Sequence, residues 1–307
     1  YDALRRQNHG RIAEKQRFIC SAKPAVIFTF GGLSKEEPLL EILEEMKAQD
    51  MRGTFFVTER ELQRNKKNIE LIRAYGQELG IGLRPEAGAD FDDYCGQIER
   101  IREGLAAYGA DTNVVRQMSG AEEAAIGEAV SAMGCILVGQ GFNAVQSKHK
   151  DAQSPEEVMP DLFGRWTTSF NRGEIIYMRT DYYTRSSLAV ELLRTLKEKK
   201  VDNIAYTTHS LPEERAKEQA ASGYRVCSVL DVLRDTDELF TYPVDLAALP
   251  EEVRPYSTEK KLAGGELTKA FYKYYVGAPE VSETDRMFGF SRIEMRKADK
   301  TGIVKTA

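Results

Sequence analysis

Short apolar runs rich in β-branched and aromatic residues alternate along the chain with segments of helical spacing. The first run, 25–30, ends at Gly31 and Gly32, and the next occupies 54–57. Between them apolar residues recur every three or four positions from Pro38, and proline suits a first helical position. Strand, helix and strand in this order predict a βαβ unit with a parallel sheet. Such sheets place ligand sites beyond the carboxyl ends of their strands, where the two glycines fall.

The same alternation continues to about residue 233. Further strands are expected at 79–83, 113–115, 135–138, 174–178, 203–206 and 224–229. Further helices are expected at 68–75, 91–108, 122–133 and 187–199. The polar segment 139–166 predicts a long loop with one short helix at 155–159. No repeat period and no low-complexity linker interrupts the series, which predicts a single α/β core.

Composition narrows the range of partners. The 307 residues carry a net charge of -5, so the chain offers no basic field that would attract nucleic acid. No stretch approaches the roughly 18 consecutive apolar residues of a membrane span. Four cysteines stand far apart without a paired spacing, which predicts buried free thiols rather than a zinc knuckle or a redox motif. They are Cys20, Cys95, Cys135 and Cys227.

Residues 29–32 are Thr-Phe-Gly-Gly, and residues 54–57 are Thr-Phe-Phe-Val. With the helix between them, they resemble the opening of the NodB-type polysaccharide deacetylases (carbohydrate esterase family 4). The pattern of that family is Thr-Phe-Asp-Asp-Gly-Pro and then Ala-Thr-Phe-Phe-Val. The family carries its catalytic-base Asp where this chain has Gly31, and a metal-ligand Asp where it has Gly32. The framework of the motif is present and its carboxylates are not.

A second motif concerns the metal-binding histidines. Residues 76–80, Gly-Gln-Glu-Leu-Gly, are similar to the family's Gly-His-Glu-Ile-Gly. In the family this motif leads into Asn-His-x-x-x-His, whose two histidines bind the metal. The corresponding positions here hold Gly82 and Glu86, so the resemblance implies that only one side chain with a ligand atom remains.

Two further motifs follow in the family's order. Residues 115–120, Val-Arg-Gln-Met-Ser-Gly, resemble Phe-Arg-Pro-Pro-Tyr-Gly and keep Arg116. Residues 173–179, Gly-Glu-Ile-Ile-Tyr-Met-Arg, resemble Gly-x-Ile-x-Leu-x-His, with Arg179 where the family has its catalytic histidine. Each motif alone is weak evidence, and their order and spacing together favour one fold.

The resemblance covers about 25–233 and implies a distorted (β/α) barrel of the NodB deacetylase type. Residues 1–24 are charged and predict a helical N-terminal extension packed outside the barrel. Residues 234–307 fall outside the resemblance and predict a small α+β appendage. The resemblance also implies an extracellular or cell-surface location. Because the numbering begins at Tyr1 rather than Met, we expect an anchoring segment upstream.

The family reaction needs a divalent metal that activates water, an Asp that takes the water's proton and a His that protonates the leaving amine. Glycines supply no ligand atoms, and Glu86 alone would not hold a metal against water. We therefore predict no intact catalytic residue and no metal or other cofactor. The expected function is that of a pseudoenzyme that binds a glycan, such as a cell-wall polysaccharide, or a partner protein.

Two alternatives of other classes stay open. One is an active metal-dependent deacetylase that hydrolyses a carbon–nitrogen or ester bond. Its metal, such as zinc, would be held by relocated ligands, for example Glu86 with Asp90, Asp92 or Asp181. The other is a structural module of a larger secreted assembly.

Arginines accumulate where the family's ligands have gone. Arg116 persists, and Arg84 and Arg179 stand at or beside motif positions. Guanidinium groups bind carboxylate, sulfate and phosphate through paired hydrogen bonds, so the pocket is predicted to accept an anionic group of a glycan. The alternative is that these arginines pair with Glu86, Asp181 or other neighbouring acids and bind nothing.

The remaining candidates have simpler explanations. His209 follows a predicted strand and is expected to be a hydrogen-bonded loop residue. Asp90, Asp92 and Asp93 are expected to begin a helix rather than to bind a cation. The Gly31–Gly32 pair is expected to form a tight turn, although it also offers a backbone surface to a ligand.

Overall fold

The computed structural model describes residues 1–17, 19, 25–163, 169–171, 173–198, 200–202 and 225–233. The appendage predicted for 234–307, the strand predicted at 203–206, His209 and Cys20 lie outside the described residues. The three described cysteines, at positions 95, 135 and 227, are buried and form no disulfide with one another, as predicted.

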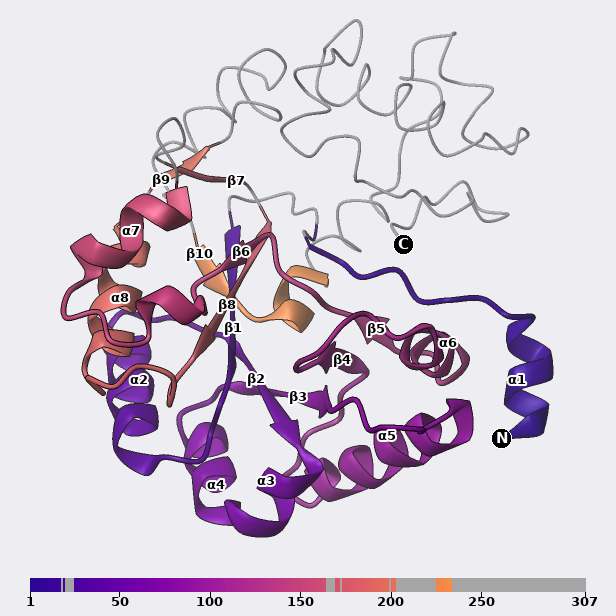
Figure 1. The fold of residues 1–307 in the computed structure, drawn as a ribbon. Coiled ribbons are helices and arrows are strands. Elements are labelled where there is room, and N and C mark those ends of the chain that lie inside the picture. Colours follow the sequence, from indigo (N-terminus) through magenta and orange to yellow (C-terminus); the bar gives the residue numbers. More distant parts are fainter. Residues whose placement is uncertain are drawn as a thin grey trace, which may run out of the picture.

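Eight strands form one sheet that curls into a half-barrel (Figure 1). Its order is β5-β4-β3-β2-β1-β8-β6, and β10 also pairs with β1. The strands are β1 (Ala25–Gly31), β2 (Thr54–Thr58), β3 (Glu78–Leu83), β4 (Val114–Gln117), β5 (Ile136–Leu137), β6 (Phe142–Asn143), β8 (Glu174–Arg179) and β10 (Arg225–Cys227). All their pairings are parallel. A separate parallel pair joins β7 (Ser169–Asn171) to β9 (Lys200–Asp202).

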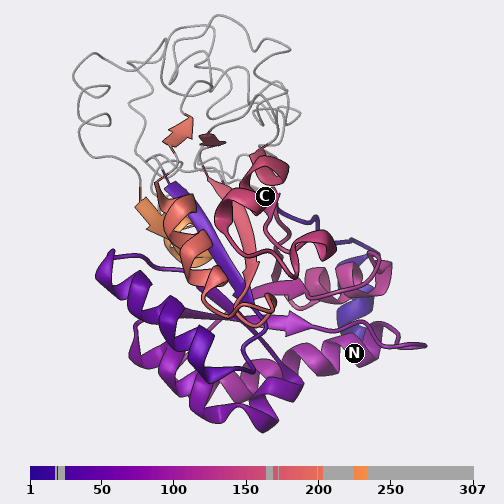
Figure 2. The same cartoon turned by 60° about the vertical axis from the view of Figure 1, so that its left-hand side comes forward.

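Helices lie around the outside of this sheet, and the turned view in Figure 2 shows the same arrangement. They are α1 (Asp2–Asn8), α2 (Glu36–Ala48), α3 (Glu59–Arg64), α4 (Lys66–Ala74), α5 (Phe91–Ala106), α6 (Ala124–Ala132), α7 (Pro155–Phe163) and α8 (Leu188–Lys197), with the short 3-10 helix η1 (Ser147–His149). Among the described helices, none combines the length and apolar character that crossing a membrane requires.

The central strand β1 is buried on both faces, which explains its unbroken apolar sequence. Phe28 and Phe30 belong to the larger core cluster, which also contains the apolar face of α2. Ala25 and Ile27 point to the opposite face and join a smaller cluster with residues of β2, β4 and β8. Because side chains alternate along a strand, the two clusters fill the layer under the helices and the interior of the half-barrel.

The strand positions predicted within the described residues are confirmed to within two residues, and so are the helices at 68–75, 91–108, 122–133 and 187–199. Several details differ. The predicted N-terminal extension is helical only over Asp2–Asn8, and residues 11–17 are not helical. Pro38 is the third helical residue of α2, not the first. The predicted loop 139–166 contains the strand β6, which exists through its pairing with β8. The predicted helix at 155–159 extends to Phe163, with Pro160 inside it.

A short stretch after α1 joins both edges of the curled sheet. The N–H of Gln16 donates to the carbonyl of Leu137 at 2.8 Å, and Gly139 donates back to the carbonyl of Gln16 at 2.8 Å. Ile19 then donates to the carbonyl of Gly173 at 2.9 Å, beside the start of β8. This stretch is therefore part of the barrel wall, although the sequence analysis placed it outside the barrel. The boundary at residues 24 and 25 stays a prediction.

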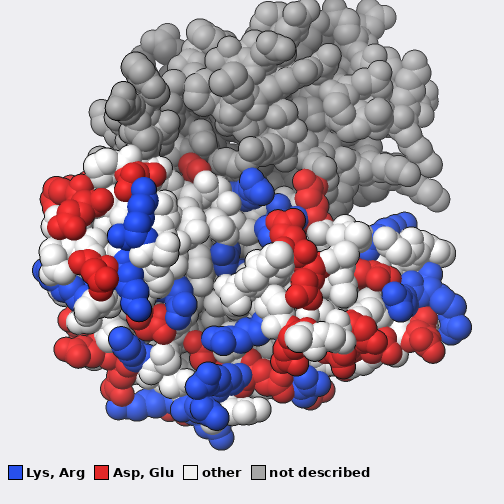
Figure 3. Space-filling view, viewed as in Figure 1, with Lys and Arg blue, Asp and Glu red and all other residues white. Residues whose placement is uncertain are grey.

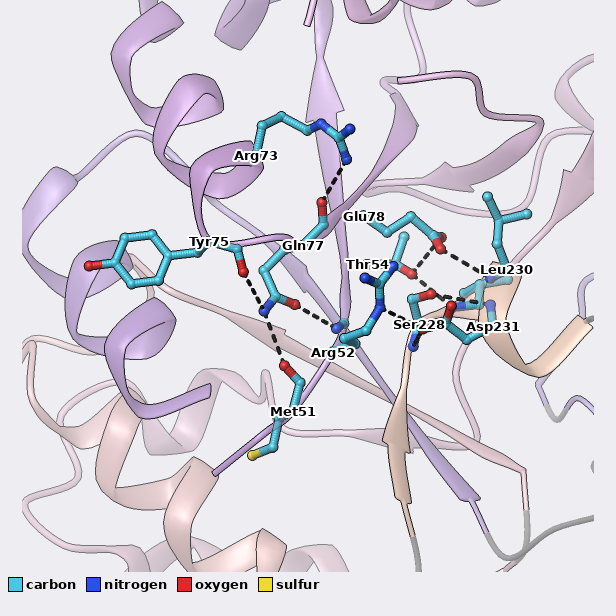
Figure 4. A network of polar contacts seen from close by, with 12 residues as sticks. Met51, Arg52, Thr54, Arg73, Tyr75, Gln77, Glu78, Ser228, Leu230 and Asp231 are labelled. Carbon is cyan, nitrogen blue, oxygen red and sulfur yellow. Dashed lines mark hydrogen bonds and ion pairs between the residues drawn. The ribbon is translucent and has the colours of Figure 1, made fainter. Parts of the chain in front are cut away.

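Polar side chains close the amino ends of β2 and β3 (Figure 4). The buried carboxylate of Glu78 accepts hydrogen bonds from the hydroxyl of Thr54 at 2.8 Å and from the N–H of Leu230 at 3.1 Å. The hydroxyl of Thr54 accepts the N–H of Val229 at 2.9 Å. These side chains satisfy the first N–H groups of the helical turn at 229–233, which would otherwise lack partners.

Candidate functional site at the carboxyl ends of the strands

The pairing of the strands brings four of the predicted site residues to one end of the half-barrel. Gly31 pairs with Arg179 across β1 and β8. Gly82 pairs with Arg116 across β3 and β4. This is the end where parallel sheets carry ligand sites, as the sequence predicted. Its floor is occupied by side chains rather than open.

Gly31 is required for space rather than for a turn. It is the last residue of β1, and a Cβ atom added to it would lie 2.5 Å from the hydroxyl of Tyr177 and 2.6 Å from Cε of Met118. The tight-turn interpretation is therefore wrong for this residue. It is right for Gly32, whose φ of 68° lies in the left-handed region that favours glycine.

An ion pair lies directly over Gly32. A Cβ atom there would come within 2.0 Å of Oδ1 of Asp181 and 2.8 Å of Nε of Arg179. Arg179 donates to the same carboxylate oxygen from Nε at 3.0 Å and from Nη2 at 2.9 Å. The other oxygen of Asp181 accepts the hydroxyl of Ser34 at 3.1 Å. Arg179 thus has the acidic partner that the alternative interpretation expected.

Met118 fills the space in front of Gly82. A Cβ atom at that glycine would lie 3.1 Å from Sδ of Met118 and 3.2 Å from Cγ2 of Thr58. The N–H of Met118 donates to the carbonyl of Leu83 at 2.8 Å, which holds the methionine beside the end of β3. Since its Cε reaches the place of a Gly31 side chain, this one residue spans from β3 to β1.

Arg116 is a buried cation. Its side chain donates to the carbonyl of Gly139 at 2.9 Å and to Oε1 of Gln140 at 2.5 Å. Its guanidinium carbon lies 3.6 Å from the centre of the Tyr177 ring, a cation–π contact. Its buried Nε has no hydrogen-bond partner, and no carboxylate among the described residues pairs with the guanidinium. Burial lowers the pKa of Arg116 and raises the pKa of Tyr177.

Arg84 and Glu86 lie apart from this cluster, on the exposed loop between β3 and α5. Gln97 holds this loop, since its Oε1 accepts the N–H of Arg84 at 3.1 Å and its Nε2 donates to Oε1 of Glu86 at 3.4 Å. No hydrogen bond or ion pair is formed by the Arg84 side chain within the described part of the chain.

The acidic cluster after this loop begins a helix, as predicted. The side chain of Asp90 accepts the N–H groups of Asp92 at 2.9 Å and Asp93 at 3.1 Å, and the side chain of Asp93 accepts the N–H of Asp90. This reciprocal pair is a capping box at the start of α5. Asp90 is therefore engaged with backbone N–H groups.

The donor set does not fit the catalytic metal that the fold family implies. Within the residues described above, no three His, Cys, Asp or Glu side chains come together in a group that would hold an ion. The space in front of the glycines contains a thioether, a phenol and an ion-paired carboxylate. Divalent metals such as zinc need several nitrogen, thiolate or oxygen ligands around one point.

Met118, Tyr177 and Gln140 belong to the site but were not predicted from the sequence. The first two were visible in the motifs, at positions where the family patterns have Pro and Leu. Each is larger than the family's residue, and each faces a glycine. The available signal was that Met118 and Tyr177 are larger than the family's residues, while the glycines that they face are smaller than the family's residues. Nothing in the sequence singled out Gln140.

Charges of both signs are mixed over the face shown in Figure 3. Lysine and arginine side chains alternate there with aspartate and glutamate, without a large region of one sign. That face therefore offers neither a broad basic nor a broad acidic surface.

No protein-family model and no curated protein matches the chain. Solved structures do. The pseudoenzyme BA3943 of Bacillus anthracis aligns with a TM-score of 0.51 at 17% identity, over 69% of this chain and 66% of its own. The fold is that of the family 4 carbohydrate esterases. PdaA of Bacillus subtilis, a member of that family, aligns with a TM-score of 0.53 at 14% identity, over 76% of this chain and 88% of its own.

A third family 4 structure is the peptidoglycan N-acetylglucosamine deacetylase Bc1960, with a TM-score of 0.53 at 17% identity over 70% of this chain and 90% of its own. The family 4 fold thus occurs in an active deacetylase and in a pseudoenzyme. Identities this low show the fold alone, and the function has to be argued from the site.

Proposed function

We propose that this chain is a polysaccharide deacetylase-like protein without deacetylase activity, which binds a glycan or a partner protein at the cell surface. One observation carries the proposal. Side chains of Met118, Tyr177 and Asp181 occupy the space in front of the glycines at the three motif positions 31, 32 and 82. Among the described residues, the site therefore lacks both the ligands and the room for a metal.

The chemistry of deacetylation gives the reason. Attack of water on an acetamide needs a group that polarises the carbonyl and a base that takes a proton. Asp181 supplies the one carboxylate that the described residues place at the floor, and it already binds Arg179 and Ser34. A methionine thioether is a soft ligand, poorly suited to the metals that activate water.

A glycan is the favoured partner because the similar structures include a peptidoglycan deacetylase. Burial of Arg116 limits which arginines could bind an anionic group of the glycan. Arg116 is 5% exposed and lies behind Tyr177, so a bound anion would first meet Arg179, which is half-exposed, and Arg84. Binding at Arg179 has to compete with Asp181, whereas Arg84 is exposed and unpaired within the described part of the chain.

Metal content and acetate release test the loss of catalysis. The protein is incubated with zinc, cobalt or nickel, desalted and analysed for metal, and then given an acetylated chitooligosaccharide. We expect less than stoichiometric metal and no acetate, with Bc1960 as the positive control. Stoichiometric metal together with acetate release would instead establish the alternative, an active deacetylase with relocated ligands.

Binding is tested separately with insoluble peptidoglycan. We expect the full chain to sediment with it, and Arg84→Ala and Arg179→Ala to reduce the bound fraction. Arg6→Ala on α1 is the matched control, because it removes an exposed arginine far along the chain from the site. Equal sedimentation of all three variants would argue against the anionic-group hypothesis.

A further inference from the structure

The floor of the site is filled by side chains that fit one another. Met118 crosses it from the end of β4, with Sδ facing Gly82 and Cε facing Gly31. The hydroxyl of Tyr177 lies beside Cε of Met118, since both come within 2.6 Å of the same absent Cβ of Gly31. Interiors are close-packed, so the space of a missing carboxylate has to be filled or left as a costly cavity.

Tyr177 also replaces an interaction. In the sequence resemblance, Gly31 stands where a carboxylate is expected near the end of β1. Without that charge, Arg116 is buried away from water and pairs with no carboxylate of the described residues, which is unfavourable for a cation. The face of the Tyr177 ring, 3.6 Å from the guanidinium, partly offsets this cost. Tyr177 thus fills the space in front of Gly31 and stabilises the positive charge of Arg116.

Asp181 occupies the space in front of Gly32, the third of the glycine positions. Its carboxylate lies where a side chain of Gly32 would begin, and it is held there by Arg179 and Ser34. An aspartate placed at position 32 would meet this like charge and would also need the left-handed φ of 68°.

We propose that Met118, Tyr177 and Asp181 form a plug in the place of the metal centre, so that restoring the ligands alone does not restore tight metal binding. The inference rests on the proposed function, because it assumes that the natural chain holds no catalytic metal. Beyond the proposed function, the inference is that three residues outside the ligand positions block the site. Removing the plug and restoring the ligands are both required.

The experiment compares two variants of the full chain. The ligand variant carries Gly31→Asp, Gly32→Asp, Gly82→His and Glu86→His. The opened variant carries the same changes with Met118→Ala, Tyr177→Leu and Asp181→Ala. We expect the opened variant to bind about one zinc per chain, and the ligand variant to bind at least roughly tenfold more weakly, a difference of about 1.4 kcal/mol. Equal zinc affinity in the two folded variants would overturn the proposal.

A second measurement uses only small changes, in case a variant with many substitutions does not fold. Melting temperatures are compared for Gly31→Ala, Met118→Ala and the pair. Gly31 has no positive φ, so its alanine has to find space rather than overcome strain. We expect Gly31→Ala to lower the melting temperature less in the Met118→Ala background than in the natural chain. An equal loss in both backgrounds would contradict the plug.

Gly80→Ala is the matched control for this cycle. Gly80 lies in the strand β3 and is crowded like Gly31, but a Cβ atom there would meet the Phe56 ring at 2.8 Å rather than Met118. Its effect should be the same with and without Met118→Ala. Failure of the two proposals is distinguishable. Stoichiometric zinc in the natural chain would refute the proposed function, whereas equal zinc affinity in the ligand variant and the opened variant would refute the plug.

Discussion

Arg116 shows how a buried cation is supported where no carboxylate of the described residues pairs with it. Its guanidinium is planar and always charged, and here it makes two hydrogen bonds in one plane while its face lies on Tyr177. A lysine has a compact charge and cannot combine these contacts. The residue therefore stabilises the floor of the site as a structural part, without contacting a reacting group.

Replacing Arg116 by lysine tests this role. We expect Arg116→Lys to lower the free energy of unfolding by about 1–3 kcal/mol, because the carbonyl of Gly139 or the side chain of Gln140 loses its donor while staying buried. Urea unfolding followed by circular dichroism measures the change. Arg84→Lys is the control and should have no measurable effect, because that side chain is exposed. Equal stability of the two variants would contradict the structural role.

Glu78 provides a pH-dependent prediction. Burial raises the pKa of Glu78 above its ordinary value of 4.5, while hydrogen bonds from Ser228, Thr54 and Leu230 act the other way. The carboxyl group of the unfolded chain therefore ionises first as the pH rises. The folded chain then binds more protons, so this group makes the free energy of unfolding fall with pH above about 4.5.

The variant Glu78→Gln should remove this decline. It should also cost about 1–3 kcal/mol, because an amide N–H would face the N–H of Leu230. The stability difference between the natural chain and the variant should be largest at acidic pH and should shrink as the pH rises. Urea unfolding at several pH values checks this. Parallel pH profiles for the two proteins would show that Glu78 does not titrate abnormally.

At the scale of elements, the loop between β1 and α2 is held by side chains from α3 and α4. Oε1 of Glu61 accepts the N–H of Leu33 at 2.9 Å, and Asn68 donates to the carbonyl of Leu33 at 2.6 Å. Glu61 also accepts the N–H and hydroxyl of Thr58 in the capping box that begins α3. One buried carboxylate thus joins the end of β1 to the start of α3, beside Gly31 and Gly32.

Removing this carboxylate should loosen the loop. We expect Glu61→Ala to lower the free energy of unfolding by about 2–4 kcal/mol, since three donors lose their acceptor. Glu59→Ala is the neighbouring control. It breaks only the exposed ion pair with Arg100 and should cost less than about 1 kcal/mol. Chemical unfolding compares the two, and a similar loss for both would contradict the anchoring role of Glu61.

Local pattern explains which elements were predictable. The strands β1, β2 and β3 are apolar runs with sharp ends, and the stripe of Ile98, Ile101 and Leu105 is visible in the sequence and buried in α5. The two-residue strand β6 has no such pattern, because its partner β8 is distant in the chain. In the site, the sequence located the glycines but not their neighbours, since the packing of Met118 against Gly31 depends on the curl of the sheet.

At the scale of the whole molecule, β5 forms one edge of the half-barrel, and at the other side β6 pairs with β8 at Ile176 and Tyr177 but not at the start of β8. Open strand edges expose unpaired backbone groups and invite association with other chains. The stretch after α1 covers both edges, with Gln16 bonded to Leu137 and Gly139, and Arg17 accepting the N–H of Ile175 at 3.3 Å. The amino-terminal segment is therefore expected to stabilise the barrel, in addition to packing α1 on α6.

Two truncations separate these contributions. Removal of residues 1–9 deletes α1 and its contacts with α6, such as the 3.2 Å ion pair between Arg5 and Glu128. Removal of residues 1–17 also deletes the stretch that covers the edges. We expect the longer truncation to lower the melting temperature further and to promote association, because the edges of β5 and β8 become available.

Hydrogen exchange at single backbone amides distinguishes the two truncations more directly than their melting temperatures do. The amides of Gly139 and Ile175 donate to Gln16 and Arg17, so both should exchange faster after removal of residues 1–17 and stay protected after removal of residues 1–9. The amide of Val138, which donates to Val115 within the sheet at 2.7 Å, is the internal control. If Gly139 and Ile175 kept their protection in the longer truncation, residues 16–19 would not close the barrel in solution. Selective loss at these two amides would show that the segment before β1 completes the wall.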